Sequence, residues 1–437
     1  MIDYITVIGG GLAGCEAAWQ IAQRGIKVKL YEMKPEKYSP AHSSSGLAEI
    51  VCSNSFKSSS LENAAGLLKE ELRTLNSLII ACADKTKVPA GQALAVDREK
   101  FSEFVTKEIE AHPNIELIRN EVEQTPDEGI VIISTGPLTS EGLSEDIKKI
   151  IGNDYLHFYD AAAPVVSYDS IDMEKAFRAD RYGKGDSDYV NCPMEIDQYE
   201  KFYTELINAE TIEIHGFEDK KVFEGCMPIE VMAKRGIQTL TFGPMKPVGF
   251  TNPKTGKQPY AVVQLRQDNI EGTLFNIVGF QTNLKWGDQK RVFSMIPGLG
   301  NADFLRYGVM HRNTYINSPQ VLTPTYSLKS RSGLFFAGQI TGVEGYVESV
   351  SSGFIAGINA VQVFLNREPI IFSRETVMGA LAAYVSSNSL GTFQPMNANF
   401  GILPPAGGKM KKDERNKFYA NRSLESITQL NKGILIF

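Results

Sequence analysis

Hydrophobic, small and polar residues follow one another near the start of the chain in an order that predicts a strand, a helix and a second strand. A short apolar run at residues 5–8 is typical of a buried strand. Small residues dominate residues 15–23, which favours a closely packed helix. A second apolar run at residues 28–31 then ends at Glu32. This order predicts a βαβ unit with parallel strands.

The turn between this first strand and the helix carries the glycines of a dinucleotide site. Gly9, Gly11 and Gly14 form the pattern G-x-G-x-x-G, which allows a tight turn, close approach of backbone N–H groups to a pyrophosphate, and close packing of helix on strand. Glu32 lies 18 residues after Gly14, where an acid accepts hydrogen bonds from the adenosine ribose. The predicted cofactor-binding residues here are Gly9, Gly10, Gly11, Leu12, Ala13, Gly14 and Glu32.

Helical periodicity follows this unit. Apolar residues recur at helical spacing over residues 61–79, and Ser59 with Glu62 predicts a capping box at the start of that helix. A continuous apolar strand at residues 130–133 closes on a turn that contains Gly136. We predict that Gly136 makes a second contact with the cofactor, the alternative being a plain core strand with a tight turn.

A late stretch repeats the strand-and-glycine pattern. The strand at residues 334–337 meets Gly338 and Gln339, and a helix follows Gly345. In FAD proteins of the glutathione-reductase class such a motif carries the ribityl chain, and Gln339 replaces the usual acid here. Two separate Rossmann domains would require a second complete fingerprint, which the sequence lacks. The pattern therefore predicts one extended FAD that is held by both ends of the chain.

The middle of the chain differs in character. From residue 168 to residue 286, charges, aromatic residues and Gly/Pro turns separate short alternating strands. We therefore predict an α/β fold in which residues 1–167 and 287–437 form a Rossmann-like FAD-binding domain of the glutathione-reductase type. Residues 168–286 are expected to form an inserted α+β domain.

Composition narrows the classes of protein. The chain has 437 residues, 43% hydrophobic and 22% charged, with a net charge of −6, which does not indicate a basic nucleic-acid-binding domain. No apolar run is long enough to span a bilayer, and no basic segment precedes the first apolar run, so we expect a cytoplasmic protein without membrane contact. The cysteines are scattered without a C-x-x-C pair, so neither disulfides nor a structural metal is indicated.

Two cysteines and a basic segment are candidates for chemistry. Cys52 lies in a Ser/Asn-rich connection, where a structural and a chemical role are equally compatible with the sequence. Cys226 lies in a turn just before a proline. Near the C-terminus Lys409, Lys411 and Lys412 follow a Pro/Gly hinge. These lysines form either a solvated helix face or a contact for an RNA backbone.

Several motifs occur together in one order: VIGGGLAGCEAA, VCSNSFKS, EGCMPIE, FGPMKPVG, FFAGQITGVEGYVES and LPPAGGKMKKDERNK. With them the chain resembles, over its full length, the bacterial folate- and FAD-dependent tRNA uracil-5-methyltransferase family (TrmFO). The related GidA/MnmG family shares GQITGVEGYVES, whereas the two cysteine loops and the basic tail distinguish the first family.

The resemblance implies that the methylene group of 5,10-methylenetetrahydrofolate is transferred to C5 of a uridine in the T-arm of tRNA, with NADH or NADPH reducing FAD. One thiolate would add to uracil C6 and one group would accept the C5 proton. The resemblance assigns Cys52 and Cys226 to these roles jointly and leaves the division between them open. It also implies that Tyr346 and His311 lie beside the folate pterin, a structural role being the alternative for His311.

Three other functions remain compatible with the sequence. A close relative of this family could act on a uridine of large-subunit ribosomal RNA with the same cofactors. A flavin oxidoreductase would instead act on a small metabolite, and a non-catalytic scaffold would bind RNA and leave folate unchanged. Transfer of label from methylenetetrahydrofolate to RNA separates these alternatives.

Overall fold

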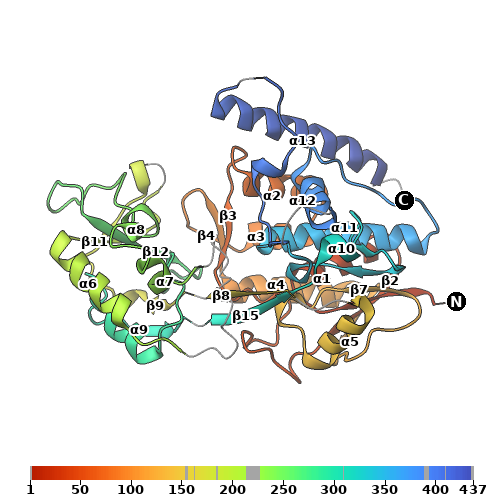
Figure 1. The fold of residues 1–437 in the computed structure, drawn as a ribbon, viewed down its shortest axis with the longest axis horizontal. Helices are drawn as coiled ribbons and strands as arrows, with labels where there is room; N and C mark the ends of the chain where they lie inside the picture. The colour runs from red at the N-terminus through yellow and green to blue at the C-terminus, as the bar shows by residue number, and fades with distance from the viewer. Residues whose placement is uncertain are drawn as a thin grey trace.

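The computed structural model describes residues 2–152, 156–161, 163–183, 186–212, 227–308, 310–387, 393–408 and 410–434. The chain forms two lobes, each with its own sheet and hydrophobic core (Figure 1). Both termini lie in the larger, first lobe, and the second lobe is built from the middle of the chain. No helix among these residues is long and apolar enough to cross a membrane.

The first lobe is built on a six-stranded sheet in the order β16-β17-β7-β1-β2-β6. Its strands are β1 (Tyr4–Ile8), β2 (Lys27–Glu32), β6 (Ile115–Arg119), β7 (Ile130–Ile133), β16 (Ser327–Leu328) and β17 (Arg331–Phe336). All neighbours pair in parallel except β16 with β17. Strand β17 comes from the far end of the chain and pairs with β7, so this sheet joins the N- and C-terminal segments. The predicted Rossmann-like α/β fold is thereby confirmed.

Two helices from opposite ends of the chain cross in close contact. They are α1 (Leu12–Ala22) and α11 (Tyr346–Phe364). A Cβ atom on Gly353 would lie 2.2 Å from the carbonyl oxygen of Ala13, and one on Gly357 would lie 2.9 Å from that of Ala17. Only glycine permits backbones to approach this closely, so the small residues of both helices fix the crossing.

The remaining helices of this lobe are α2 (Ala64–Thr74), α3 (Leu78–Lys85), α4 (Arg98–Ala111), α5 (Glu141–Ile151), α10 (Ser318–Val321), α12 (Val377–Ser386) and α13 (Lys412–Ile434). A small sheet is formed by β3 (Ser55–Ser58), β4 (Lys87–Val88) and β5 (Ala93–Val96).

The predicted capping box at Ser59 is wrong. Helix α2 begins at Ala64, and the side chain of Asn63 caps it by accepting a hydrogen bond from the Ala65 N–H at 3.0 Å. The apolar periodicity that follows covers two helices, because Asn76 has a φ of +60° and ends the first one. Ser77 then caps α3. Periodicity continues across this break because both helices bury the same side against one core.

The second lobe is an antiparallel sheet in the order β10-β11-β12-β13-β9-β14. Its strands are β9 (Val165–Ser167), β10 (Phe177–Arg178), β11 (Val190–Met194), β12 (Ala261–Gln267), β13 (Leu274–Ile277) and β14 (Phe304–Arg306). Its helices are α6 (Ile196–Asn208), α7 (Ile229–Ala233), α8 (Thr239–Phe242) and α9 (Trp286–Phe293). Strands β9 and β14 belong to this sheet but lie outside the predicted insertion range 168–286. The exact bounds of the two domains stay a prediction.

Two antiparallel strands lie between the lobes. They are β8 (Leu156–Ala161) and β15 (Met310–Tyr315), which flank the second lobe in the sequence (Figure 1). The chain thus enters and leaves the second lobe along one paired ribbon, and Arg306 at the end of β14 donates a hydrogen bond to the Val51 carbonyl of the first lobe.

A buried carboxylate joins three helices of the first lobe. Glu71 on α2 accepts hydrogen bonds from the N–H groups of Val377 and Met378, at the start of α12, and from the Ser423 hydroxyl on α13. Burial raises the pKa of Glu71 to about 7. The proton is therefore bound more tightly in the folded than in the unfolded state, and the stability that it contributes is present below pH 4.5 and is lost as pH rises through 7.

We expect the difference in unfolding free energy between the wild-type protein and Glu71→Gln to fall between pH 4.5 and 7, by up to about 3 kcal/mol. Urea melts across this pH range measure it. Glu70→Gln, which changes a partly exposed carboxylate on the same helix, is the matched control. A wild-type minus Glu71→Gln difference that stays constant or rises with pH would contradict the assignment.

Candidate active site

The glycine turn after β1 forms one wall of a large cavity in the first lobe. Gly9 has a φ of +102°, and a Cβ atom there would lie 2.8 Å from the backbone of Ser134. A Cβ atom on Gly14 would lie 1.8 Å from the carbonyl oxygen of Gly9, which shows how closely α1 packs on the turn. Gly11 caps α1 and has no protein atom within 4 Å of its Cβ position. This leaves the helix N-terminus open to a phosphate.

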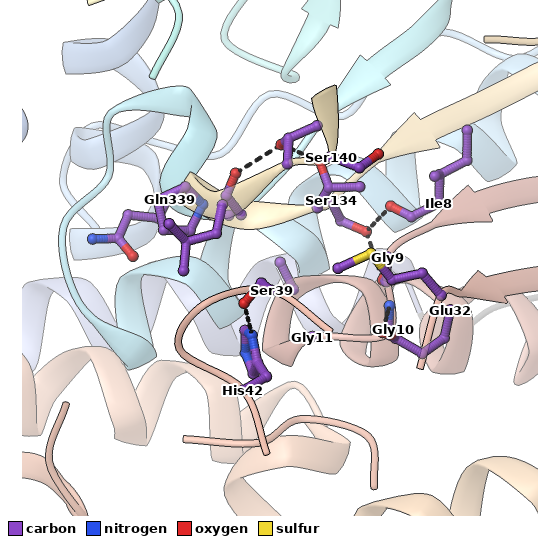
Figure 2. Close-up of a pocket in the computed structure, with 18 of the residues that line it drawn as sticks. Ile8, Gly9, Gly10, Gly11, Glu32, Ser39, His42, Ser134, Ser140 and Gln339 are labelled. Atoms are coloured by element: carbon purple, nitrogen blue, oxygen red, sulfur yellow. Dashed lines mark hydrogen bonds between the residues drawn. The ribbon is translucent and has the colours of Figure 1, made fainter. Parts of the chain in front are cut away.

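Glu32 lies beside this turn, at the end of β2 (Figure 2). One carboxylate oxygen accepts a hydrogen bond from the Gly10 N–H at 2.9 Å, and the other accepts one from the Lys34 N–H at 3.0 Å. Each oxygen keeps a second lone pair, so the carboxylate can still accept hydrogen bonds from ribose hydroxyls.

The predicted second and third cofactor contacts face the same cavity. Ser134, after β7, donates hydrogen bonds to the carbonyls of Ile8 and Gly9, and Gly136 opens the short helix η1 (Gly136–Leu138) on the cavity wall. Gly338 and Gln339 also line the cavity, and Gln339 lies across it from Glu32 (Figure 2).

The late motif differs in detail from its usual form. The Gln339 side-chain amide donates a hydrogen bond to Glu344 at 2.7 Å, so an amide stands on the cavity wall where related folds place an acid. Gly345 does not line the cavity. It has a φ of +122° and starts α11, and a Cβ atom on it would lie 2.3 Å from the Glu348 carboxylate. Its role is to set the direction of α11.

The cavity fits an extended dinucleotide such as FAD. A backbone cradle without side chains, a helix N-terminus and a ribose-binding acid stand at one end, and Gly338 and Gln339 stand at the other. Among the described residues, no group of three or more His, Cys, Asp or Glu side chains could hold a metal ion. FAD would supply hydride transfer here, held by residues from both ends of the chain.

Cys52 lies on the wall of this cavity and contacts Tyr346. The Tyr346 hydroxyl oxygen accepts hydrogen bonds from the N–H groups of Cys52 and Ser53 at 3.0 and 3.2 Å, and lies 2.9 Å from the Cys52 sulfur. Both lone pairs of the hydroxyl are therefore used, so its own proton is directed at the sulfur. Burial and the nearby sulfur raise the pKa of Tyr346, which keeps that proton on the tyrosine. Such a donor stabilises a thiolate.

The other described cysteines have core positions. Cys15, Cys82 and Cys192 are buried, whereas Cys52 is half-buried. Burial raises the pKa of Cys82 and of Cys192 to about 12, so both stay protonated at neutral pH. The described part of the chain therefore offers Cys52 as its reactive thiol.

The described residues do not include all of the predicted site. Cys226 and Lys409 lie outside the described residues, and His311 is described only as part of strand β15. Lys411 and Lys412 are exposed where α13 begins, on the side that faces the second lobe (Figure 1).

Sequence reasoning missed a polar cluster on the cavity wall. The Ser39 hydroxyl lies 2.6 Å from His42 Nδ1, and buried Lys34 pairs with Glu49 at 3.1 Å. Burial and then the charge of Lys34 lower the pKa of His42, so the imidazole is neutral at pH 7. A histidine in a serine-rich loop just after Glu32 was the available signal.

Comparison with known proteins gives concordant matches. The sequence profile of the family described as Glucose inhibited division protein A matches residues 4–368. The methylenetetrahydrofolate–tRNA-(uracil-5-)-methyltransferase TrmFO of Acetivibrio thermocellus is 61% identical over 430 residues, covering 98% of this chain and 99% of that protein. The protein of the same name from Bacillus subtilis strain 168 is 59% identical over 431 residues, with the same coverage.

Among solved structures, the form II crystal structure of GidA from Aquifex aeolicus has the same fold. It superposes with a TM-score of 0.73 at 18% identity, covering 99% of this chain and 73% of that one.

Proposed function

Because the chain belongs to the methylenetetrahydrofolate–tRNA-(uracil-5-)-methyltransferase TrmFO family, and to the broader Glucose inhibited division protein A family, we propose that it methylates C5 of a T-loop uridine in tRNA. The methylene group comes from 5,10-methylenetetrahydrofolate, and NADH or NADPH supplies the electrons through FAD. We place the reaction in the cytoplasm. The observation that carries this proposal is a half-buried thiol on the wall of a dinucleotide cavity in a chain of this family.

The chemistry needs a thiolate and a proton acceptor. Uracil C5 is a poor nucleophile until a thiolate adds to C6, which places negative charge on C5 and O4. C5 then attacks the activated methylene, and loss of the C5 proton to a base lets tetrahydrofolate leave from the resulting exocyclic methylene. Reduced FAD, when bound, would supply the hydride that converts this methylene to a methyl group as the thiolate leaves C6. Cys52 and Cys226 fill these two roles jointly, and the division between them stays open.

Tyr346 acts on Cys52 as a positioning residue. Its hydroxyl oxygen accepts hydrogen bonds from the N–H groups of Cys52 and Ser53, and its proton is directed at the Cys52 sulfur. These contacts fix the position of the Cys52 sulfur and stabilise its thiolate form before the RNA substrate binds. We propose that the Tyr346 ring also forms part of the pterin site together with His311, since its ring is only partly buried and lines the cavity.

One assay tests the proposed function. The flavin-loaded protein is incubated with methylenetetrahydrofolate labelled in its methylene group, NADH or NADPH, and a T-arm transcript. We expect label in 5-methyluridine, and none when the target uridine is replaced by cytidine. Label in a large-subunit rRNA fragment but not in the transcript would identify the related target, and NAD(P)H oxidation without label in any RNA would indicate a small-molecule oxidoreductase.

Lys411 and Lys412 are proposed to contact the RNA backbone. No ion pair involves either ammonium group within the described residues, and both residues are exposed where α13 begins. Each phosphate contact releases about one counterion, so Lys411→Gln with Lys412→Gln should weaken T-arm binding and reduce the slope of log Kd against log salt by about 2. Fluorescence anisotropy at several salt concentrations measures both.

The matched control neutralises two exposed lysines elsewhere, Lys107 on α4 and Lys149 on α5. This variant has the same net charge but should keep the wild-type slope. Equal slopes for the two double variants would remove the α13 lysines from the RNA site.

A further inference from the structure

Three arginines hold the loop that carries Cys52. Arg98, the first residue of α4, donates hydrogen bonds to the carbonyls of Ile50 and Val51 at 3.1 Å. Arg306, at the end of β14, donates a hydrogen bond to the same Val51 carbonyl at 2.6 Å. The carbonyls of residues 50–51 therefore accept hydrogen bonds from an arginine of each lobe.

The third arginine forms hydrogen bonds with the residues that follow Cys52. Arg266 on β12 donates hydrogen bonds to the Ser53 hydroxyl at 2.8 Å and to the Asn54 side-chain oxygen at 3.0 Å. The Asn54 amide in turn donates to the carbonyls of Val96 and Gln267, one from each lobe. We call Arg98, Arg266 and Arg306 the arginine clamp.

The arginine clamp carries more positive charge than its surroundings neutralise. Asp268 pairs with Arg98 at 2.9 Å, and both side chains are largely buried, 13% and 5% exposed for Arg98 and Asp268. Among the described residues, no carboxylate forms an ion pair with Arg266 or Arg306. Burial, and then the charge of Arg98, lower the pKa of Arg306. An uncompensated, partly buried cation is unfavourable, and a nearby anion would stabilise it.

We propose that the arginine clamp stabilises the thiolate of Cys52, so that the second lobe supplies the positive charge that activates a cysteine of the first. Arg98 and Arg306 both donate to the carbonyl of Val51, the residue directly before Cys52, and this brings both guanidinium groups within electrostatic range of the sulfur. Arg306 is thereby a positioning residue that acts through Cys52. The inference deepens the proposed function and rests on it for the use of the thiolate, whereas its test needs neither RNA nor folate.

Two ion pairs lie beside the same cavity, whose wall also carries the Glu32 carboxylate. Lys57 on β3 pairs with Glu348 on α11, and Lys34 pairs with Glu49 on the cavity wall. Tyr346 adds a donor but no charge. His42 is neutral at pH 7, and Tyr189 faces Arg266 as a neutral phenol because burial raises its pKa. Asp268 acts on all three arginines of the clamp, so one carboxylate opposes three guanidinium groups.

The test is the pH dependence of Cys52 alkylation by iodoacetamide in the flavin-loaded protein, followed by mass spectrometry of the Cys52 peptide. We expect the wild-type thiol to react with an apparent pKa below the ordinary value of about 8.5. Arg306→Met should raise this apparent pKa by about one unit, and Arg306→Lys, which keeps the charge, should raise it by less than half as much. Arg331→Met is the matched control, since Arg331 also donates to a backbone carbonyl, that of Pro126, away from Cys52.

A second variant tests the charge in the opposite direction. Asp268→Asn leaves Arg98 without its carboxylate and should lower the apparent pKa of the Cys52 thiol, so the test remains decisive if Arg306→Met does not fold. Superimposable profiles for the wild type, Arg306→Met and Asp268→Asn would overturn the proposal. So would equal shifts for Arg306→Met and Arg306→Lys, or a variant that loses RNA methylation while Cys52 alkylation is unchanged, because the cation would then act on the RNA.

Discussion

Replacement of Cys52 by serine is expected to lower RNA methylation by at least about 10³-fold while flavin stays bound. A serine hydroxyl occupies nearly the same volume beside Tyr346 but is almost never ionised at neutral pH, so the anion needed at this position is lost. The measurement is label transfer to the T-arm transcript, with flavin content read from absorbance.

The matched control is Cys82→Ala, which removes a buried thiol on α3 and should keep full activity. A transcript that contains 5-fluorouridine traps the covalent adduct, and the cysteine found in the adduct, Cys52 or Cys226, is the nucleophile. Methylation by Cys52→Ser within tenfold of the wild-type rate would remove this thiol from the chemistry.

Gly14→Ala is expected to abolish flavin binding, with a loss of affinity of at least about 100-fold. The new methyl group would lie 1.8 Å from the Gly9 carbonyl oxygen and 2.6 Å from the Ser134 hydroxyl, so helix and turn must separate and the backbone cradle is lost. Titration of the stripped protein with FAD, followed by flavin fluorescence, measures the affinity.

Two other alanine variants sharpen this result. Gly287→Ala, on α9 of the second lobe, meets no atom within 4 Å and should bind flavin normally. Gly11→Ala also meets no protein atom, so weaker binding by this variant reports the approach of the cofactor itself to the backbone. A yellow Gly14→Ala protein with wild-type affinity would show that the turn does not hold the pyrophosphate.

The βαβ unit could be predicted from the sequence because its constraints are local. Within about 30 residues, the strand, the glycine turn and the helix each need particular residue types at fixed spacing. The continuous apolar run Ile130–Ile133 likewise indicates a buried parallel strand. The helix start after Ser59 was mispredicted because several polar residues in succession can cap a helix. The observed cap is Asn63, and the residues before it pack closely on the first turn of the helix: a Cβ atom on Gly66 would lie 2.0 Å from the Ser60 carbonyl oxygen.

The candidate site could be predicted only in part. Glycine positions and Glu32 follow from backbone geometry, so the sequence indicates them directly. The arginine clamp could not be found in this way, because Arg98, Arg266 and Arg306 are far apart in the chain and resemble ordinary charged residues until the two lobes are placed together. The Tyr346 hydroxyl contact with Cys52 depends on the same long-range assembly.

The pairing of β17 with β7 has a consequence for biosynthesis. Strand β17 and helix α11 leave the ribosome only after the whole second lobe, whose sheet is contained in residues 165–306, has been made. The second lobe can therefore fold while the nascent first lobe still lacks an inner strand of its sheet. The cavity takes part of its wall from Gly338, Gln339 and Tyr346, so it is complete only after these residues have been translated.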